Sequence, residues 1–215
     1  MGDLDVMKLT KQCKAVANYI IEEINKYNEG KNLRQKLLFT TKRLQKLLYF
    51  CEVEYMIRNN GSPLFDDEFY AWPSGPVIEE IYHEFMQYQA GDIQPKYDKK
   101  EYNLSQDIKF IIDQILEASK VLDTRDLIMM SNVPGGPHSK VFNEKDKDYK
   151  QKVSKKETYS YYSRKEIISQ LNQGESIINI LYQTYGLVKS QRNHLEEESL
   201  EQDKPKLLLK NKKSN

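Results

Sequence analysis

Apolar side chains recur at three- and four-residue spacing along most of this chain of 215 residues, which is the pattern of amphipathic helices. Thr10 is a plausible helix cap, and a first stripe runs from there to Tyr27, ending in the polar segment 28–32. A second stripe follows Thr40 and Thr41 and ends at Asn60. We predict two helices here, the second of them buried on one side only.

The next segment changes period and becomes aromatic. Residues 62–72, SPLFDDEFYAW, contain two short apolar pieces separated by an acidic turn, so we predict a small hairpin and place the only sheet-like part at residues 64–72. Gly75 and Pro76 follow, and proline suits the first position of a helix, so a third helix is expected from there to about Tyr88.

The second half alternates helical patterns with breaks. We predict helices over 105–122 and 124–130, a turn at 132–139 and an aperiodic stretch rich in lysine and tyrosine at 140–162. Ser163 and Glu166 have the spacing of a capping box, which predicts another helix that is interrupted at Gly174 and resumes through Tyr185. From about Lys189 onward few apolar residues remain, which predicts a solvated tail.

These patterns predict a mainly α fold: a single helical domain with one short hairpin. We divide the chain into an N-terminal helix at 1–34, a domain at 35–188 and a polar, flexible tail at 189–215. Within that tail, Leu207, Leu208 and Leu209 are the main apolar residues, and they are either solvated or a docking peptide for a partner. Deletion of the tail is expected to leave the melting temperature nearly unchanged.

Composition and charge narrow the class of protein. The net charge of +1 does not indicate a polyanionic partner for the chain as a whole. The charges are nevertheless unevenly distributed: residues 31–58 contain seven Lys or Arg and two Glu, whereas residues 62–107 contain ten Asp or Glu and three Lys. Cys13 and Cys51 lie on apolar helical faces, which favours reduced core thiols. The N-terminus has no signal-peptide pattern and no apolar run is long enough to span a bilayer, so we expect a cytoplasmic protein without a membrane partner.

Candidate chemistry is sparse, and we expect no catalytic residues, no metal and no cofactor. His83, His138 and His194 stand in three different contexts, and neither cysteine has a histidine at a local helical spacing. The acidic run 66–68 lacks the spacing of a calcium loop, and PGGPHS lacks the Lys-Ser/Thr end of a phosphate-binding loop. YSYYSRKE, residues 159–166, is either a base-stacking segment or a loop that covers the core.

The order of motifs between residues 40 and 85 is distinctive. A lysine-containing KLLYF helix is followed by PLF and an acidic turn, an extended piece ending in Trp72, a Gly-Pro-Val segment and then Tyr82. In this order the chain resembles the Panacea antitoxin family, which includes SocA-like and phage-associated GepA-like proteins; a looser match extends to about residue 172. The family often carries Thr-His and then Pro-Trp pairs, where this chain has Ser131-Asn132 and Pro137-His138.

The resemblance implies a non-enzymatic antitoxin that binds and neutralises a cognate protein toxin. A protease, self-association and DNA are left open as further partners, and a small hydrolase acting on nucleic acid or nucleotides is the third hypothesis. The alternative function is a DNA-binding transcriptional regulator of its own operon, for which Lys42, Arg43 and Lys46 are too few to form a footprint alone. The residues that we assign to partner binding are Lys46, Tyr49, Asp67, Glu68, Phe69, Tyr70, Trp72, Gly75, Pro76, Val77 and Tyr82.

Trp72 is the only tryptophan of the chain and precedes Pro73, which favours extended geometry and places the ring at a corner. Such a ring either plugs the core or stands at the surface as an anchor for a partner. We predict a plug that is at least half buried against the second and third helices. Tyr49, Phe69, Tyr70 and Tyr82 would then frame the recognition surface.

Overall fold

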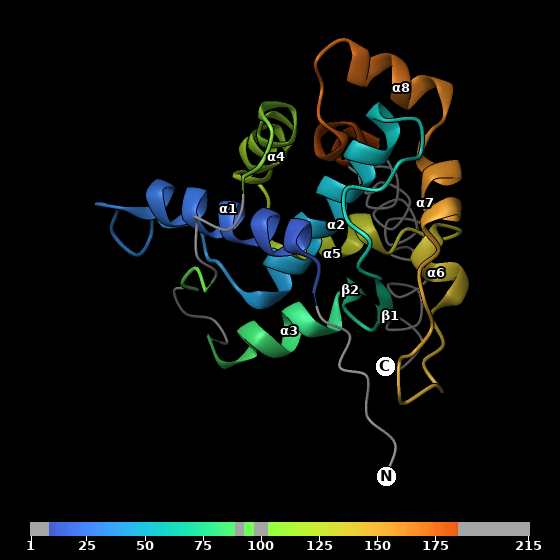
Figure 1. The fold of residues 1–215 in the computed structure, drawn as a ribbon, viewed down its shortest axis with the longest axis horizontal. Coiled ribbons are helices and arrows are strands. Elements are labelled where there is room, and N and C mark those ends of the chain that lie inside the picture. The colour runs from blue at the N-terminus through green and yellow to red at the C-terminus, as the bar shows by residue number, and fades with distance from the viewer. Residues whose placement is uncertain (1–8, 89–92, 97–102, 185–215) are drawn as a thin grey trace, which may run out of the picture.

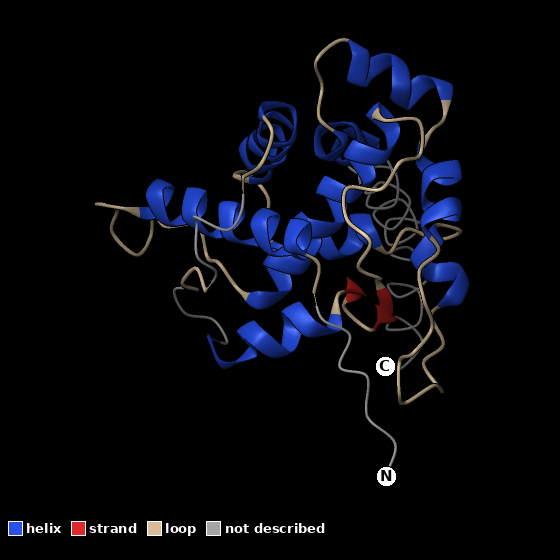
Figure 2. Cartoon of the chain, viewed as in Figure 1, coloured by secondary structure: helices blue, strands red, loops and turns tan. Residues whose placement is uncertain are grey.

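The computed structural model describes residues 9–88, 93–96 and 103–184 of the chain. Over these residues the fold is mainly α, as predicted, with one small two-stranded sheet (Figures 1 and 2). The elements, in order, are α1 (Lys11–Asn28), α2 (Thr41–Arg58), β1 (Tyr70–Trp72), β2 (Gly75–Val77), α3 (Glu79–Phe85), the 3-10 turn η1 (Met86–Tyr88), α4 (Gln106–Ser119), α5 (Thr124–Ser131), α6 (Pro137–Val141), α7 (Lys155–Tyr162) and α8 (Lys165–Asn172). Residues 177–184 are also helical.

Helix α1 has the amphipathic form that its sequence predicts. The Thr10 hydroxyl accepts a hydrogen bond from the Cys13 amide and so caps the helix. Its apolar stripe is buried, while Lys11 and Lys26 on the opposite side are exposed. Because this stripe joins the same hydrophobic core as the rest of the chain, α1 is packed into the domain (Figure 1).

Helix α2 lies at the centre of the molecule, and the expectation that it is buried on one side only is wrong. It contacts α1, α3, α4, α5, α7 and β2, and nearly all of its residues are buried. The stripe Leu44–Leu47–Leu48 is buried, but so are six polar side chains of the helix. These are Thr41, Arg43, Gln45, Lys46, Glu52 and Glu54.

The buried polar side chains of α2 bond to backbone groups of the segments around the helix. Arg43 donates to the carbonyls of Ser119 and Leu122 at 2.6 and 2.9 Å, where α4 ends and its carbonyls have no partner within the helix. On other faces of α2, Glu52 accepts from the Leu64 amide at 2.8 Å and Glu54 from the Ile177 amide at 2.9 Å. These charged side chains can be buried because each of them has a hydrogen-bond partner.

The hairpin is displaced toward the C-terminus from its predicted place. Strands β1 and β2 pair in an antiparallel register, Trp72 opposite Gly75, across the two-residue turn Pro73–Ser74. The segment 75–77 that we expected to start a helix is therefore a strand, and α3 starts at Glu79. Pro76 lies opposite Ala71 in the middle of the strand pair, and its carbonyl accepts a hydrogen bond from α2, so this proline does not open a helix.

The second half confirms some predictions and corrects others. The helix α4 is capped by Ser105, and α5 begins with a capping box between Asp123 and Asp126. The stretch 140–162 is not aperiodic throughout, because it contains α7, capped by Ser154. The predicted capping box at Ser163 is absent: α8 begins after Arg164, without a side-chain cap.

The segment 159–166 spans the end of α7 and the start of α8, with the Tyr162 ring fully buried. Tyr162 thus supports the interpretation that the rings of this segment cover the core. The predicted tail and its leucines lie outside the described residues, as does His194. In the described part of the chain, no helix is long and apolar enough to cross a membrane.

Candidate partner-binding site

Two side chains of α2, those of Lys46 and Gln45, form hydrogen bonds with the backbone at the end of the hairpin β1–β2. Lys46 Nζ donates to the Pro76 carbonyl at 2.6 Å, and the Gln45 amide exchanges hydrogen bonds with the backbone of Ile78, at 3.0 Å to its oxygen and 2.9 Å from its nitrogen. Lys46 is fully buried, and burial lowers the pKa of its amine well below the usual value. The backbone at the end of the hairpin is thus fixed by a buried helix.

Gly75 is the point where the hairpin and this support meet. Its φ is +94°, in the region that favours glycine. A Cβ at this position would lie 2.6 Å from each of Lys46 Nζ, Ser131 Oγ and Asn132 Oδ1. The absence of a side chain therefore lets the end of α5 and the lysine of α2 close around the turn.

His138, at the start of α6, holds the other side of the turn. Its Nε2 lies 2.9 Å from the Trp72 carbonyl, and because a carbonyl oxygen only accepts, Nε2 is the protonated nitrogen. The ring is buried, which lowers its pKa, and the nearby Lys46 charge acts in the same direction. Nδ1 of His138 and Nε1 of Trp72 are buried without a hydrogen-bond partner among the described residues.

A row of aromatic rings runs across the hairpin from α3 to α6. The Trp72 ring lies 4.8 Å from that of Tyr82 and 6.4 Å from that of Tyr149, measured between ring centroids. Tyr149 stacks on Phe142 at 6.3 Å, and Phe142 stacks on His138 at 5.3 Å. We call Trp72, Tyr82, Phe142 and Tyr149 the aromatic row; all four side chains are half-buried, so part of each faces solvent.

The backbone of Tyr149 has an uncommon conformation. Its φ of +48° lies in the left-handed region, which a bulky residue adopts only when its surroundings impose it. The segment 151–153 lies next to β1, where the Ala71 amide donates to the Gln151 carbonyl and the Val153 amide to the Phe69 carbonyl, both at 2.8 Å. This pairing fixes the chain just after Tyr149 and so places its ring in the aromatic row.

Charges around the aromatic row are mixed, although its sequence neighbourhood is acidic. Glu79 pairs with Lys150 at 2.5 Å, and Glu68 lies 3.6 Å from Lys152. Asp67 accepts hydrogen bonds from the amide and the hydroxyl of Thr10 and so ties the acidic turn to the start of α1. Lysines of 150–152 thus neutralise part of the acidic rim that the sequence indicated.

The structure places the predicted site residues in two groups. Trp72 is more than half-buried, as predicted, and its ring lies beside Tyr82 of α3, while part of the ring faces solvent. Half-buried side chains at the surface are Asp67, Glu68, Tyr70, Trp72 and Tyr82. Buried ones are Lys46, Tyr49, Phe69, Gly75, Pro76 and Val77.

Tyr49 and Phe69 cannot frame a recognition surface, because they are only 1% and 2% exposed. Their rings pack against each other at 5.3 Å in the core, and burial raises the pKa of Tyr49. The signal that would have separated them from Tyr70 is the two-residue period of a strand, in which Phe69 and Ala71 face inward and Tyr70 outward.

Ser131, Asn132, His138, Phe142 and Tyr149 escaped prediction as parts of this site. The first three occupy the positions where this chain departs from the Panacea pattern, and the structure shows that they surround Gly75 and Trp72. Their position in that pattern was a usable signal. Nothing in the local sequence marks Phe142 or Tyr149, because their approach to Trp72 depends on the path of the chain between α6 and α7.

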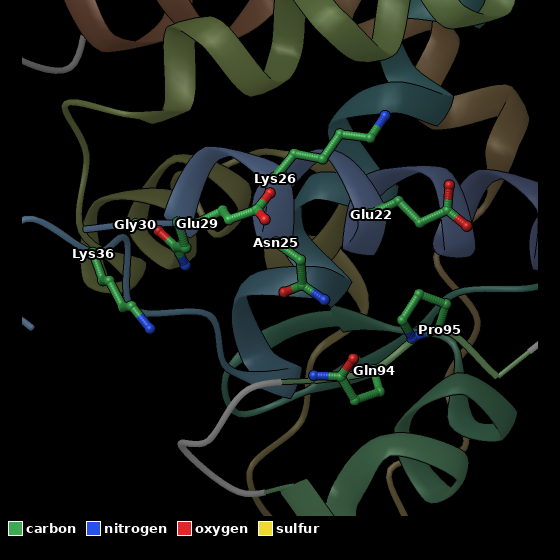
Figure 3. A pocket seen from close by; sticks show the side chains of 9 residues that line it. Glu22, Asn25, Lys26, Glu29, Gly30, Lys36, Gln94 and Pro95 are labelled. Carbon is green, nitrogen blue, oxygen red and sulfur yellow. The ribbon is translucent and has the colours of Figure 1, made fainter. Parts of the chain in front are cut away.

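Other possible sites on the described surface are less developed. A hollow of about 440 Å³ is lined by residues of α1, of the loop that follows it and of the segment 94–95; Figure 3 shows these side chains. Both cysteines are free and buried, and burial raises the pKa of each thiol. Among the described residues, no group of three or more His, Cys, Asp and Glu side chains could hold a metal ion.

Comparison with known proteins bears on this region of the chain. Residues 44–136, a little under half of the chain, match the family model described as "Antitoxin SocA-like, Panacea domain". This confirms the resemblance to the Panacea family over α2, the hairpin and α3 to α5, and the family name supports an antitoxin role in general. No curated protein and no solved structure matches the chain.

Proposed function

We propose that this protein is an antitoxin that binds and neutralises a cognate protein toxin, and that it acts by binding, without a catalytic step. The observation that carries the proposal is the match of residues 44–136 to the antitoxin family, which includes the hairpin, Lys46 and the Ser131–Asn132 pair. We also propose that it acts in the cytoplasm.

The aromatic row, together with Tyr70, is the surface that we assign to toxin binding. Tyrosine and tryptophan are enriched at interfaces because they offer a large apolar area and a polar end at a low cost in conformational entropy. These rings are half-buried and their backbone is fixed by α2, α6 and the segment 151–153. A preformed surface of this kind loses little freedom on binding.

The burial of basic side chains on α2 argues against the DNA-binding alternative through this helix. Arg43 and Lys46 are buried and bonded to backbone carbonyls, which leaves Lys42 as the exposed member of the three. A protein that binds DNA through phosphate contacts needs several accessible cations. Two of the three basic side chains of this segment, Arg43 and Lys46, are therefore structural.

Growth rescue tests the proposal most directly. The reading frame next to that of this chain would be expressed from an inducible promoter, and we expect it to arrest growth unless this chain is co-expressed. The purified pair should form a complex by size-exclusion chromatography. A neighbouring product that is toxic and is neither bound nor neutralised would contradict the proposal.

Variants then locate the surface. Tyr70→Ala combined with Tyr82→Ala should weaken toxin binding by at least about tenfold, since central aromatic residues cost more than 1 kcal/mol on truncation. Tyr182→Ala is the matched control, because Tyr182 is 43% exposed on the last described helix and away from the hairpin in sequence. Equal affinities of the two variants, with unchanged melting, would exclude the aromatic row as the surface.

A further inference from the structure

The loop between α1 and α2 presents leucines to solvent within a basic sequence. Residues 30–51 contain no acidic residue, and the loop 31–38, KNLRQKLL, contains three basic ones. Leu33 is 89% exposed and Leu38 is 61% exposed. A single exposed leucine is ordinary, but two on one short basic loop indicate a contact surface. We call Lys31, Leu33, Arg34, Lys36 and Leu38 the basic loop surface.

This loop has a defined shape and a projecting position. The buried Asn28 side chain exchanges hydrogen bonds with the backbone of Leu37, at 3.0 Å to its oxygen and 2.8 Å from its nitrogen. The Asn32 carbonyl accepts from the amides of Gln35 and Lys36 at 3.0 and 3.1 Å. Figure 1 shows the loop at the left end of the molecule, where the chain turns back from α1 toward α2. A folded turn at such a tip can contact a flat surface with little further ordering.

Acidic side chains beside the loop are bonded to partners within the domain. The hollow between α1 and α4, which Leu37 lines, has three carboxylates on its walls. Glu23 pairs with Lys26, Asp113 accepts from the Tyr19 hydroxyl, and Glu117 pairs with Lys120. The amines of Lys31 and Lys120 both lie over the Tyr27 ring, at 2.8 and 4.7 Å from its centroid. Glu29 is the exposed acidic residue next to the loop in sequence, and the three cations of the loop outnumber it.

The chemistry of this tip matches the surface of a bilayer that contains anionic lipids. Leucines on a projecting turn can enter the boundary between headgroups and acyl chains, while lysine and arginine keep their charges at the level of the lipid phosphates. A hollow of about 630 Å³ lined by Lys31, Asn32, Leu33, Arg34 and Lys36 leaves room for a phosphate between the three cations. A protein partner would need a concave surface, both acidic and apolar, that encloses the tip, whereas an anionic bilayer offers negative charge and apolar depth to any projecting loop.

We propose that the basic loop surface binds the anionic face of a lipid bilayer. Leu33 and Leu38 enter the interfacial region, and Lys31, Arg34 and Lys36 contact the lipid phosphates. Three cations and two leucines give a partition constant of the order of a single acyl anchor, about 10⁴ M⁻¹, so binding is peripheral and reversible.

This surface differs from the features on which the earlier expectations were based. The prediction that the protein has no membrane partner was based on the absence of a membrane span and a signal peptide, neither of which surface binding requires. The inference is also independent of toxin binding, which we assign to the hairpin.

Sedimentation of the full chain with large vesicles tests this binding. Vesicles of phosphatidylcholine with about one-third phosphatidylglycerol should carry the protein into the pellet, and vesicles of phosphatidylcholine alone should bind it at least about tenfold more weakly, because they lack the negative surface potential. An increase in salt from about 0.1 to about 0.5 M should weaken binding to the anionic vesicles several-fold, since exposed charges are screened.

Fluorescence gives the orientation of the bound protein. The Leu33→Trp variant adds a tryptophan to the tip, and we expect brominated acyl chains in the anionic vesicles to quench it. The wild type contains only Trp72, in the hairpin, so its fluorescence should stay unquenched under the same conditions.

A matched pair of variants makes the test specific to the loop. Leu33→Asn combined with Arg34→Gln should lower the partition onto anionic vesicles about twentyfold, since one cation contributes about fivefold and one inserted methylene about fourfold. Ile168→Asn combined with Lys165→Gln is the control, because it makes the same changes of charge and polarity at exposed positions of α8, away from the loop (Figure 1). This control should bind like the wild type. Circular dichroism checks that both variants are folded.

Three results would overturn the proposal. Wild-type protein that stays in the supernatant with anionic vesicles at about 0.1 M salt would exclude the bilayer and leave the basic loop surface to an acidic protein partner. Equal binding of the loop variant and the α8 control would show that no single surface is responsible. Quenching of Trp72 in the wild type, without quenching at position 33 in the variant, would show that the hairpin contacts the bilayer instead.

Discussion

Helices α1 and α2 have the same length but opposite relations to the rest of the molecule. Each has 18 residues, yet α1 keeps one side in solvent while α2 is buried nearly all round. The charged residues of α1 lie on its exposed and half-exposed positions, whereas those of α2 at Arg43, Lys46, Glu52 and Glu54 are buried. A charged residue in a helix can thus be a solvated surface group or a fixed partner for the backbone of neighbouring segments.

The two helices also differ in how they serve the candidate site. Lys46 of α2 bonds to β2, and the Gly75 turn closes on the same amine, so the hairpin depends directly on this buried helix. Helix α1 is linked to the acidic turn through Thr10 and Asp67, at the edge of the site. Substitutions on α2 should therefore disturb both the fold and the site.

The largest effect is expected at Arg43. Arg43→Ala removes two charge-assisted hydrogen bonds to the end of α4 and leaves a cavity, so we expect a loss of about 4 kcal/mol in the free energy of unfolding. Burial lowers the pKa of this guanidinium to about 10, so it is still charged at neutral pH. Urea denaturation measures the loss. Lys42→Ala, at the exposed position next to it, should stay within about 0.5 kcal/mol of the wild type.

Truncation of Trp72 should have the next largest effect. Trp72→Ala is expected to lower the free energy of unfolding by about 3 kcal/mol. This is the lower end of the range for truncation of a large aromatic residue, because the ring is not fully buried. Tyr70→Ala on the same strand should melt near the wild type and lose toxin affinity instead. A Trp72→Ala protein that melts like the wild type but no longer binds toxin would make Trp72 the anchor rather than the plug.

Gly75→Ala separates backbone strain from close contact. We expect the free energy of unfolding to fall by about 2 kcal/mol. Part of this loss comes from the left-handed backbone and part from the collision of the added Cβ with Lys46, Ser131 and Asn132. Gly174→Ala is the matched control, because its φ of +91° is similar and nothing lies within 4 Å of the added Cβ. If both variants lose the same stability in thermal or urea unfolding, the packing around Gly75 contributes nothing.

The sequence predicts the helices well and the site only in part, for physical reasons. The apolar period marks α1, α4 and α5, and the cap at Thr10 marks the start of α1, because these elements satisfy their own hydrogen bonds and bury one stripe. Gly75 and Pro76 have the local signature of a helix start, but pairing with β1 and the bond from Lys46 make them a strand. Such a tertiary contact cannot be read from a local window.

The position of Trp72 was predictable from Pro73, since proline constrains the residue before it. Its neighbours were not. His138 and Tyr149 reach the hairpin from 66 and 77 positions away in sequence, and composition alone does not reveal such proximity. The buried charges of α2 were misread for a related reason, because a lysine that bonds a distant carbonyl looks in sequence like a lysine in solvent.

His138 should make stability depend on pH. Its pKa in the folded state is lowered by burial, so the unfolded chain binds the proton more readily, and stability is lost as the pH falls from about 6.5 through the folded-state pKa. His138→Gln, which keeps a donor for the Trp72 carbonyl, should show a smaller loss between pH 7.5 and 5 by urea denaturation. Glu52 and Glu54 have raised pKa values and shift stability in the opposite direction, equally in both proteins. Identical pH profiles of the two proteins would contradict the role of His138.

Each of these two helices contains one cysteine, so alkylation of the unmodified protein can compare how readily the two helices open. Cys13 of α1 and Cys51 of α2 are both fully buried with raised pKa values, so each should react with iodoacetamide only when its helix opens. Helix α1 is more peripheral, and we expect Cys13 to be alkylated at least about tenfold faster than Cys51 at low urea, a difference of roughly 1.4 kcal/mol in opening free energy. Mass spectrometry of the two cysteine peptides over time gives both rates. Equal alkylation rates that follow global unfolding would show that α1 and α2 open as one unit. The two helices would then differ in how they are packed but not in their local stability.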